Sequence, residues 1–201
     1  MKFKLFNIDF EITFLFAALI AFVIAMNSPF NVLATILSSL LHEAGHLVMM
    51  YCSDNLPQCV RFEITGMNIK RQPSVKISTK HEVLIALGGP IANAIILLSS
   101  CVLLCFFQSE KLFTLACVNL ILMTFNLLPV KRLDGGMALY FLLSKNISPD
   151  FCGKIIKITS VFFIILIYIW GVYVFISTNY NISALIIAIF LTLSMLGSNE
   201  Y

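Results

Sequence analysis

The chain has 201 residues, of which 60% are apolar and only 11% are charged. Soluble domains average about 45–50% apolar and about 25% charged residues, so a soluble domain of this composition would leave much apolar surface in water. The composition therefore excludes a cytosolic enzyme, a secreted disulfide-rich domain, a nucleic-acid-binding protein and a disordered tail. It indicates a protein embedded in a lipid bilayer.

Six apolar segments are long enough, or nearly so, to cross a bilayer as helices. A helix needs about 20 apolar residues to cross roughly 30 Å of hydrocarbon. The first segment follows two lysines, as a secretory signal does, but Asp9 and Glu11 precede it and no small-residue cleavage site follows, so we expect an uncleaved span. The expected spans are 12–27, 30–51, 83–107, 112–128, 155–177 and 182–197.

The basic residues predict the orientation of these spans. With the N-terminus in the cytoplasm, all Lys and Arg residues except Lys111 fall in cytoplasmic segments. Cytoplasmic loops of membrane proteins carry an excess of Lys and Arg. We therefore expect a multi-pass protein of the cell membrane with both termini in the cytoplasm.

The segment 53–81, between the second and third spans, is the one sizeable early stretch outside the membrane. Residues 60–69 alternate between apolar and polar and are rich in strand-forming types, with Gly66 as a turn or bulge, and a weaker alternation follows at 75–79. This pattern predicts a small β-hairpin at the cytoplasmic face. The expected fold class is an all-α polytopic membrane protein of about six helices that carries this hairpin.

The second span contains three ionisable residues, His42, Glu43 and His46, in an otherwise apolar run. Helical spacing places His42 and His46 one turn apart on the same face, close enough to share a metal ion. Neutral imidazoles are good zinc ligands. Glu43 lies about 100° round the helix from His42, where it can act as a general base toward water at the metal.

A purely structural interpretation of these residues is less favourable. A lone buried histidine is more often a packing residue, and we expect that role for His81 at its span boundary. Three ionisable groups within five positions of a span would cost several kcal/mol if they had no partners. Their concentration at one depth favours a functional site.

A catalytic zinc ion has three protein ligands and one open position, so a third ligand must come from another span. Asp134 follows the fourth span and precedes Gly135 and Gly136, which allow the backbone to turn sharply. In the predicted topology the second and fourth spans both run toward the cytoplasm, so Asp134 lies at the same half of the membrane as His46. The alternative is that Asp134 is the N-cap of a helix at about 137–144.

The third span contains small residues and one carboxamide. Gly88, Gly89 and Pro90 precede Asn93, and small residues allow helices to approach closely. Asn93 is a candidate to bind the substrate backbone or to hydrogen-bond a metal ligand; a hydrogen bond that only joins two helices is the favoured alternative.

The motif 42–46, HEAGH, together with Asn126, Pro129, Asp134 and Gly135 in a second span, resembles the site-2 protease family (peptidase M50) of intramembrane zinc metalloproteases. The six-span sporulation factor IVB protease subgroup is the most similar. The resemblance covers about residues 30–136. It implies that His42, His46 and Asp134 bind Zn²⁺, that Glu43 is the base, and that Asn126 holds the substrate.

Two features differ from the family pattern. Residues 130–132, VKR, replace the more apolar, often proline-containing residues that usually precede Leu-Asp-Gly, which affects the expected path of the loop. The chain also stops soon after the sixth span, so we expect no regulation through a C-terminal CBS domain or a PDZ domain.

We therefore expect a single membrane-embedded domain over residues 1–201, with a three-helix catalytic core at about 30–136 and C-terminal helices at about 155–197. The expected function is hydrolysis of a peptide bond in or near the transmembrane segment of a membrane-anchored protein, with the active site facing the cytoplasmic side. A regulatory membrane partner is a further expectation. The alternatives are a membrane zinc transporter and a catalytically inactive membrane adaptor.

Overall fold

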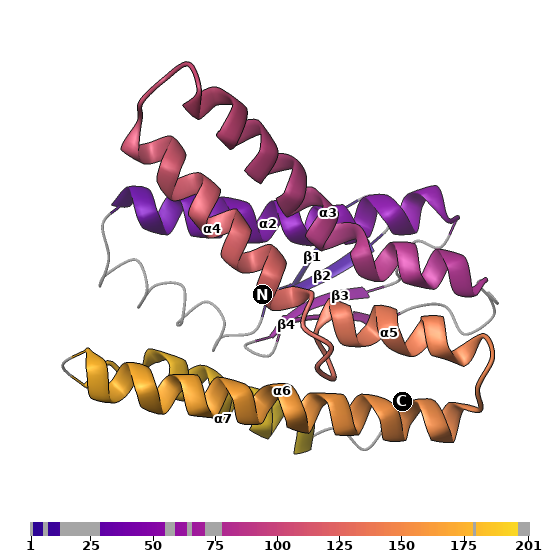
Figure 1. The fold of residues 1–201 in the computed structure, drawn as a ribbon. Helices are drawn as coiled ribbons and strands as arrows, with labels where there is room; N and C mark the ends of the chain where they lie inside the picture. Colours follow the sequence, from indigo (N-terminus) through magenta and orange to yellow (C-terminus); the bar gives the residue numbers. More distant parts are fainter. Residues whose placement is uncertain are drawn as a thin grey trace. The chain divides into compact units, whose positions relative to one another are not determined.

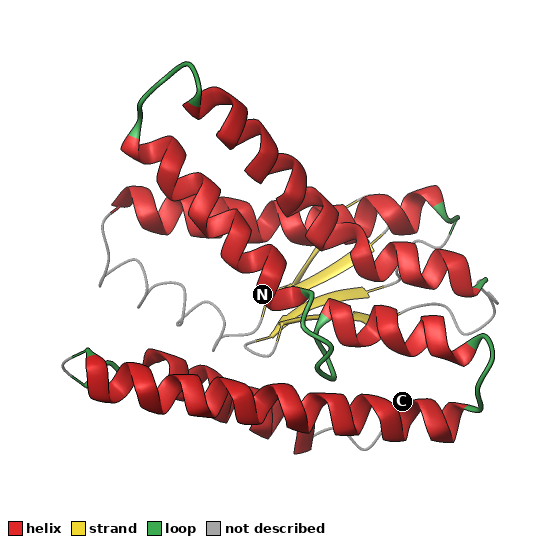
Figure 2. Ribbon diagram, viewed as in Figure 1, coloured by secondary structure: helices red, strands yellow, loops and turns green. Residues whose placement is uncertain are grey.

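The computed structural model describes residues 2–5, 8–12, 29–54, 59–63, 66–70, 78–178 and 180–196. The chain forms two compact units, Met1–Phe125 and Asn126–Tyr201. The first contains a four-stranded sheet and the helices α2, α3 and α4, and the second contains α5, α6 and α7 (Figures 1 and 2). We describe each unit by itself.

The sheet of the first unit joins two segments that are distant in the sequence. Its strands β1 (Lys2–Leu5), β2 (Ile8–Ile12), β3 (Cys59–Glu63) and β4 (Gly66–Lys70) lie side by side in that order. The pairs β1–β2 and β3–β4 are antiparallel, whereas β2 and β3 are parallel. The register sets Lys2 opposite Glu11 and Lys4 opposite Asp9.

The predicted hairpin is confirmed as β3–β4, but its position differs from the prediction. Both strands lie within 59–70, so the alternation at residues 60–69 contains the turn and the second strand as well as the first. Thr79 is not a strand residue but the first residue of α3. Residues 75 and 77 lie outside the described residues. The strands β1 and β2 were not predicted.

The helices α2 (Pro29–Cys52) and α3 (Thr79–Leu104) form the packed centre of the first unit. The buried face of α2 recurs about every fourth residue and contains Ala34, Ser38, His42, His46 and Met50. Two glycines, Gly45 and Gly88, bring the helices together so closely that a Cβ on either one would overlap the carbonyl oxygen of the other. This close approach places the buried face of α2 directly against the backbone of α3.

The helix α4 (Glu110–Asn126) runs in the same direction as α2. The Lys111 ammonium lies 5.6 Å from the centre of the Phe30 ring, and the Asn119 amide donates to Ser38 Oγ at 2.9 Å. Both contacts join residues that are 81 apart in the sequence. The two helices therefore run side by side in the same direction, as the predicted topology requires of the second and fourth spans.

The second unit begins with a loop that is hydrogen-bonded to a long helix. The helices are α5 (Asp134–Ser144), α6 (Pro149–Ser177) and α7 (Ser183–Leu196). In the loop before α5, the Lys131 backbone N–H donates to Ser160 Oγ at 2.8 Å, and the Pro129 carbonyl accepts from Thr159 Oγ1 at 3.0 Å. These two bonds to α6 hold the loop in one path.

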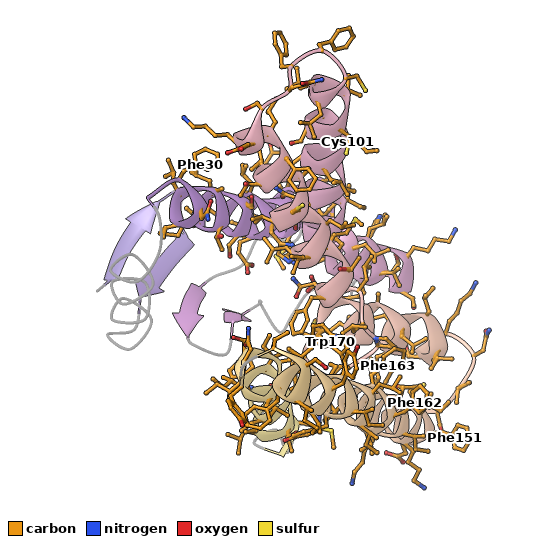
Figure 3. All side chains as sticks on the ribbon, turned by 60° about the vertical axis from the view of Figure 1, so that its left-hand side comes forward. Phe30, Cys101, Phe151, Phe162, Phe163 and Trp170 are labelled. Carbon is orange, nitrogen blue, oxygen red and sulfur yellow. The ribbon has the colours of Figure 1, made fainter. Side chains whose placement is uncertain are left out.

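The lengths and exposed surfaces of the helices identify a polytopic membrane protein. By length and composition, α2, α3 and α6 are each apolar enough to cross a bilayer, while α4 and α7 have 17 and 14 residues. The aromatic side chains of Phe151, Phe162 and Trp170 on α6 are 55%, 57% and 59% exposed, as expected for a surface in contact with lipid (Figure 3). The predicted span 12–27 lies outside the described residues except for Ile12, which ends β2, so the count of six spans stays a prediction.

Candidate metal centre

Two imidazoles lie together on the buried face of α2. The side chains of His42 and His46 are only 6% and 7% exposed, and their Nε2 atoms are 3.3 Å apart. The predicted placement of both rings on one helix face is therefore present in the structure.

The proton on the His46 ring is located by a backbone carbonyl. His46 Nδ1 lies 2.8 Å from the Ile85 carbonyl oxygen. The Gly89 backbone N–H also approaches this Nδ1, at 3.4 Å. Since a carbonyl oxygen can only accept a hydrogen bond, the shorter contact decides: Nδ1 carries the proton and Nε2 presents a lone pair.

The His42 ring has the same arrangement but a side chain as its partner. His42 Nδ1 is hydrogen-bonded to the carboxamide oxygen of Asn93, which is completely buried. Because this oxygen also only accepts, Nδ1 carries the proton here too and Nε2 is unprotonated. Asn93 therefore contacts His42, one of the residues expected to bind a metal, and its NH₂ group donates to Asn119 Oδ1 at 2.8 Å.

The two Nε2 atoms are buried and lie 3.3 Å apart, an arrangement that fits a shared cation. Gly89 adds a second indication, because a Cβ at this position would overlap Nε2 of both His42 and His46. The donor set and the space left by Gly89 suit a metal ion that prefers imidazole nitrogen, such as Zn²⁺.

Glu43 follows His42 on α2 and is half-buried. A rotation of about 100° per residue places it beside the face of α2 that carries the two imidazoles instead of on that face.

Asp134 is the first residue of α5, in the second unit. The alternative role as N-cap is wrong, because Leu133 is the N-cap of α5. The neighbouring glycines lie inside the first turn of the helix, so they do not form the sharp turn that was predicted. A Cβ on Gly135 or Gly136 would overlap the carbonyl oxygen of Leu127 or Val130, so these glycines allow the preceding loop to fold tightly against the start of α5.

The loop that leads to Asp134 contains two basic residues with unusual properties. Arg132 has φ 74°, in the left-handed region that side chains with a Cβ seldom occupy. Burial lowers the pKa of Lys131 below 10.5, and the positive charges of Arg132 and Lys157 lower it further. The residues that differ from the family pattern thus form a strained, positively charged corner of the loop.

Asn126 is the last residue of α4 and is half-buried, at the start of the second unit. The sequence analysis did not identify Asn119 and Ser38, which are 0% and 1% exposed and continue the hydrogen bonds from Asn93. A polar residue in the middle of an apolar span is a signal that points to Asn119. Ser38 has no comparable signal, because a lone serine is common in membrane helices.

Comparison with known proteins identifies the fold. The structure is similar to the solved structure "Site-2 Protease from Methanocaldococcus jannaschii", with a TM-score of 0.71 and 22% sequence identity over 100% of this chain and 95% of that chain. No protein-family model and no curated protein sequence matches the chain. The four-stranded sheet and the helices described above therefore form the fold of a site-2 protease.

Proposed function

We propose that this chain belongs to the site-2 protease family and is an intramembrane zinc metalloprotease. Its substrate would be a membrane-anchored protein, cut in or near the transmembrane segment. The observation that carries the proposal is the pair of buried imidazoles on a helix of membrane length, each with Nδ1 hydrogen-bonded to an oxygen and with the two Nε2 atoms 3.3 Å apart. Similarity to a site-2 protease fold supports it.

His42, His46 and Asp134 would hold the zinc ion. Two nitrogens and one carboxylate are a common donor set of catalytic zinc. Asp134 enters this set through the resemblance to the family pattern, in which the Asp-Gly pair follows the fourth span.

A bound zinc ion would polarise the scissile carbonyl and make nearby water more acidic. Glu43 would take the proton of the attacking water and later give it to the leaving amine. Asn126 would hold the substrate backbone. The substrate helix must first unwind locally, because the carbonyls of a helix are engaged in its own hydrogen bonds.

The setting of this chemistry follows from the distribution of charge. We place the protein in the cell membrane with both termini and the mouth of the active site on the cytoplasmic side, since all basic residues but Lys111 fall there in the predicted topology. His42 and His46 would then lie roughly 9–14 Å inside the bilayer, so water must enter from the cytoplasm. A membrane partner that controls substrate entry remains part of the proposal.

The decisive experiment compares the wild-type chain with Glu43→Gln in proteoliposomes loaded with Zn²⁺. The probe is a fluorogenic single-span peptide whose apolar segment is interrupted by glycine and proline, so that it unwinds easily. We expect wild type to cleave it and Glu43→Gln to be slower by about 10²–10⁴-fold, the usual contribution of a general base. Zinc affinity of the variant should stay that of wild type, because Glu43 is not a ligand.

Equal cleavage by both proteins would refute the assigned chemistry. Zinc flux across the liposome membrane without cleavage would favour a transporter. Zinc binding with neither activity would favour an adaptor that has kept the metal centre.

A further inference from the structure

We propose that Asn119 is a positioning residue of the metal centre: through Asn93, it fixes the tautomer in which His42 can bind a metal. This inference rests on the proposed metal-binding role of His42. It assigns a function to a residue on a third helix that itself makes no contact with either imidazole among the hydrogen bonds of the described residues. Asn119 and Asn93 are both completely buried.

A backbone carbonyl on α4 sets the orientation of the Asn119 amide. Asn119 Nδ2 lies 2.9 Å from the carbonyl oxygen of Leu115 and 2.9 Å from Ser38 Oγ. The carbonyl oxygen can only accept, so the Asn119 amide must direct its NH₂ group to that side. Its own oxygen then faces the opposite way, toward Asn93.

The Asn119 amide in turn sets the orientation of the Asn93 amide. Asn119 Oδ1 lies 2.8 Å from Asn93 Nδ2, so Asn93 must donate with its NH₂ group there. Its oxygen consequently faces His42 Nδ1, which must be the donor. The Leu115 carbonyl thus determines, through two carboxamides, which nitrogen of His42 carries the proton.

The direction of these hydrogen bonds matters because a carboxamide has nearly the same shape in both orientations. Without Asn119, the Asn93 amide can rotate by about 180° and present its NH₂ group to the ring. His42 Nδ1 would then accept, the proton would move to Nε2, and that nitrogen would lose the lone pair that binds metal. Hydrogen bonds behind a histidine ligand commonly change metal affinity by about 10–100-fold.

His46 provides an internal comparison. Its Nδ1 is hydrogen-bonded to the Ile85 backbone carbonyl at 2.8 Å, and a backbone carbonyl cannot reverse its polarity. The tautomer of His46 therefore does not depend on Asn119. A change at Asn119 should affect one ring of the pair and leave the other unchanged, which a general loss of packing would not do.

The first test reads the tautomers directly in the metal-free protein. The chain has three histidines, so ¹⁵N-histidine solid-state NMR of the full chain in liposomes is simple to interpret, with His42→Ala and His81→Gln used for assignment. We expect wild type to show His42 and His46 protonated at Nδ1. Asn119→Leu should move the His42 proton to Nε2 in a large part of the population and leave His46 as it is.

The second test measures affinity for Zn²⁺ alone, by competition with a chelating dye. Asn119→Leu, which has the same branched shape but is apolar, should weaken binding by about 10–100-fold. Ser100→Ala is the matched control: this buried serine of α3 donates to the Ile96 carbonyl and lies outside the hydrogen bonds that join His42, Asn93 and Asn119. We expect this control to bind within about twofold of wild type, since it keeps the oriented chain.

A rescue variant tests whether Asn119 orients the Asn93 side chain or only joins two helices. Asn93→Asp has oxygen at both positions, so it accepts from His42 Nδ1 whichever way it turns. The double variant Asn93→Asp/Asn119→Leu should therefore bind zinc much more tightly than Asn119→Leu alone, although it contains neither carboxamide. A role in helix joining alone predicts no such recovery.

Two results would overturn the inference while leaving the proposed function intact: wild-type zinc affinity and His42 tautomer in a folded Asn119→Leu protein, or a double variant no better than Asn119→Leu. Failure of wild type itself to bind zinc, or unchanged binding in His42→Ala, would instead refute the metal centre on which both proposals rest.

Discussion

The two helix pairs of this protein, α2–α3 and α6–α7, are joined by different means. In the first pair, the contact glycines face rigid groups: a Cβ on Gly45 would meet the Gly88 backbone, and one on Gly89 would meet both imidazoles. In the second pair, a Cβ on Gly171 would meet the Leu185 side chain at 2.9 Å and the Leu185 backbone nitrogen at 3.2 Å. A flexible side chain can move aside more easily than a carbonyl at 2.3 Å or a packed imidazole ring.

The buried polar groups follow the same division. The α2–α3 contact encloses His42, His46 and Asn93, all of them hydrogen-bonded. The corresponding bond between α6 and α7 is a longer contact of 3.4 Å between the Tyr168 and Thr192 hydroxyls. One pair is built to hold atoms at fixed positions, whereas the other has the looser construction of helices that mainly meet lipid.

The largest difference between the pairs should appear in metal binding. Gly89→Ala places a methyl group against Nε2 of both histidines, so we expect at least about a 100-fold loss of zinc affinity, more than a change behind one ligand produces. Gly171→Ala should bind zinc like wild type. Isothermal titration of the two purified variants, with helix content checked by circular dichroism, measures the contrast. Equal affinity in Gly89→Ala would show that the imidazoles do not meet at this glycine.

A smaller effect is expected in stability. Gly45→Ala forces α2 away from the Gly88 carbonyl, and such overpacking typically costs about 1–3 kcal/mol. Gly153→Ala on α6 meets nothing within 4 Å and should stabilise the helix by up to about 1 kcal/mol, the difference in helix propensity. Thermal unfolding in detergent tests both. A Gly45→Ala protein as stable as wild type would contradict the close approach of α2 and α3.

The smallest expected effect concerns Lys131, in the loop fastened to α6. Its pKa in the folded protein is lowered, chiefly by burial and also by Arg132 and Lys157. Between that pKa and 10.5 the unfolded chain binds more protons than the folded chain, so folding stability rises with pH across this window. Below the window the penalty is constant.

Lys131→Met removes the titrating group, so the melting temperature of wild type should rise relative to that of the variant as the pH is raised toward 10.5. Differential scanning fluorimetry at a series of alkaline pH values measures this difference. A constant difference across the series would show that Lys131 keeps an ordinary pKa in the folded chain.

The local signals in the sequence predicted much of the metal centre. The spacing of His42 and His46 requires only that the segment be a helix, and the apolar run around them predicts one. The hairpin followed from alternation at residues 60–69, although its turn lies within that alternation. The strands β1 and β2 also alternate, but their charged residues were interpreted as the flank of a span.

Other features depend on which helices meet, and no single segment reveals that. The orientation of Asn93 is determined by Asn119 and Leu115, on a helix that follows it in the chain. Likewise, Gly135 suggests flexibility when only its neighbours in sequence are considered. Its actual role is close packing, because the loop folds back over the start of α5.

The parallel pairing of β2 with β3 limits how the first unit can be placed in a membrane. Strands of one sheet cannot lie on opposite sides of a bilayer, so residues 8–12 and 59–63 share a side although α2 lies between them. The N-terminal strands and the hairpin must lie on the same side of the membrane. A labelling experiment that finds the side of either segment therefore finds the side of both.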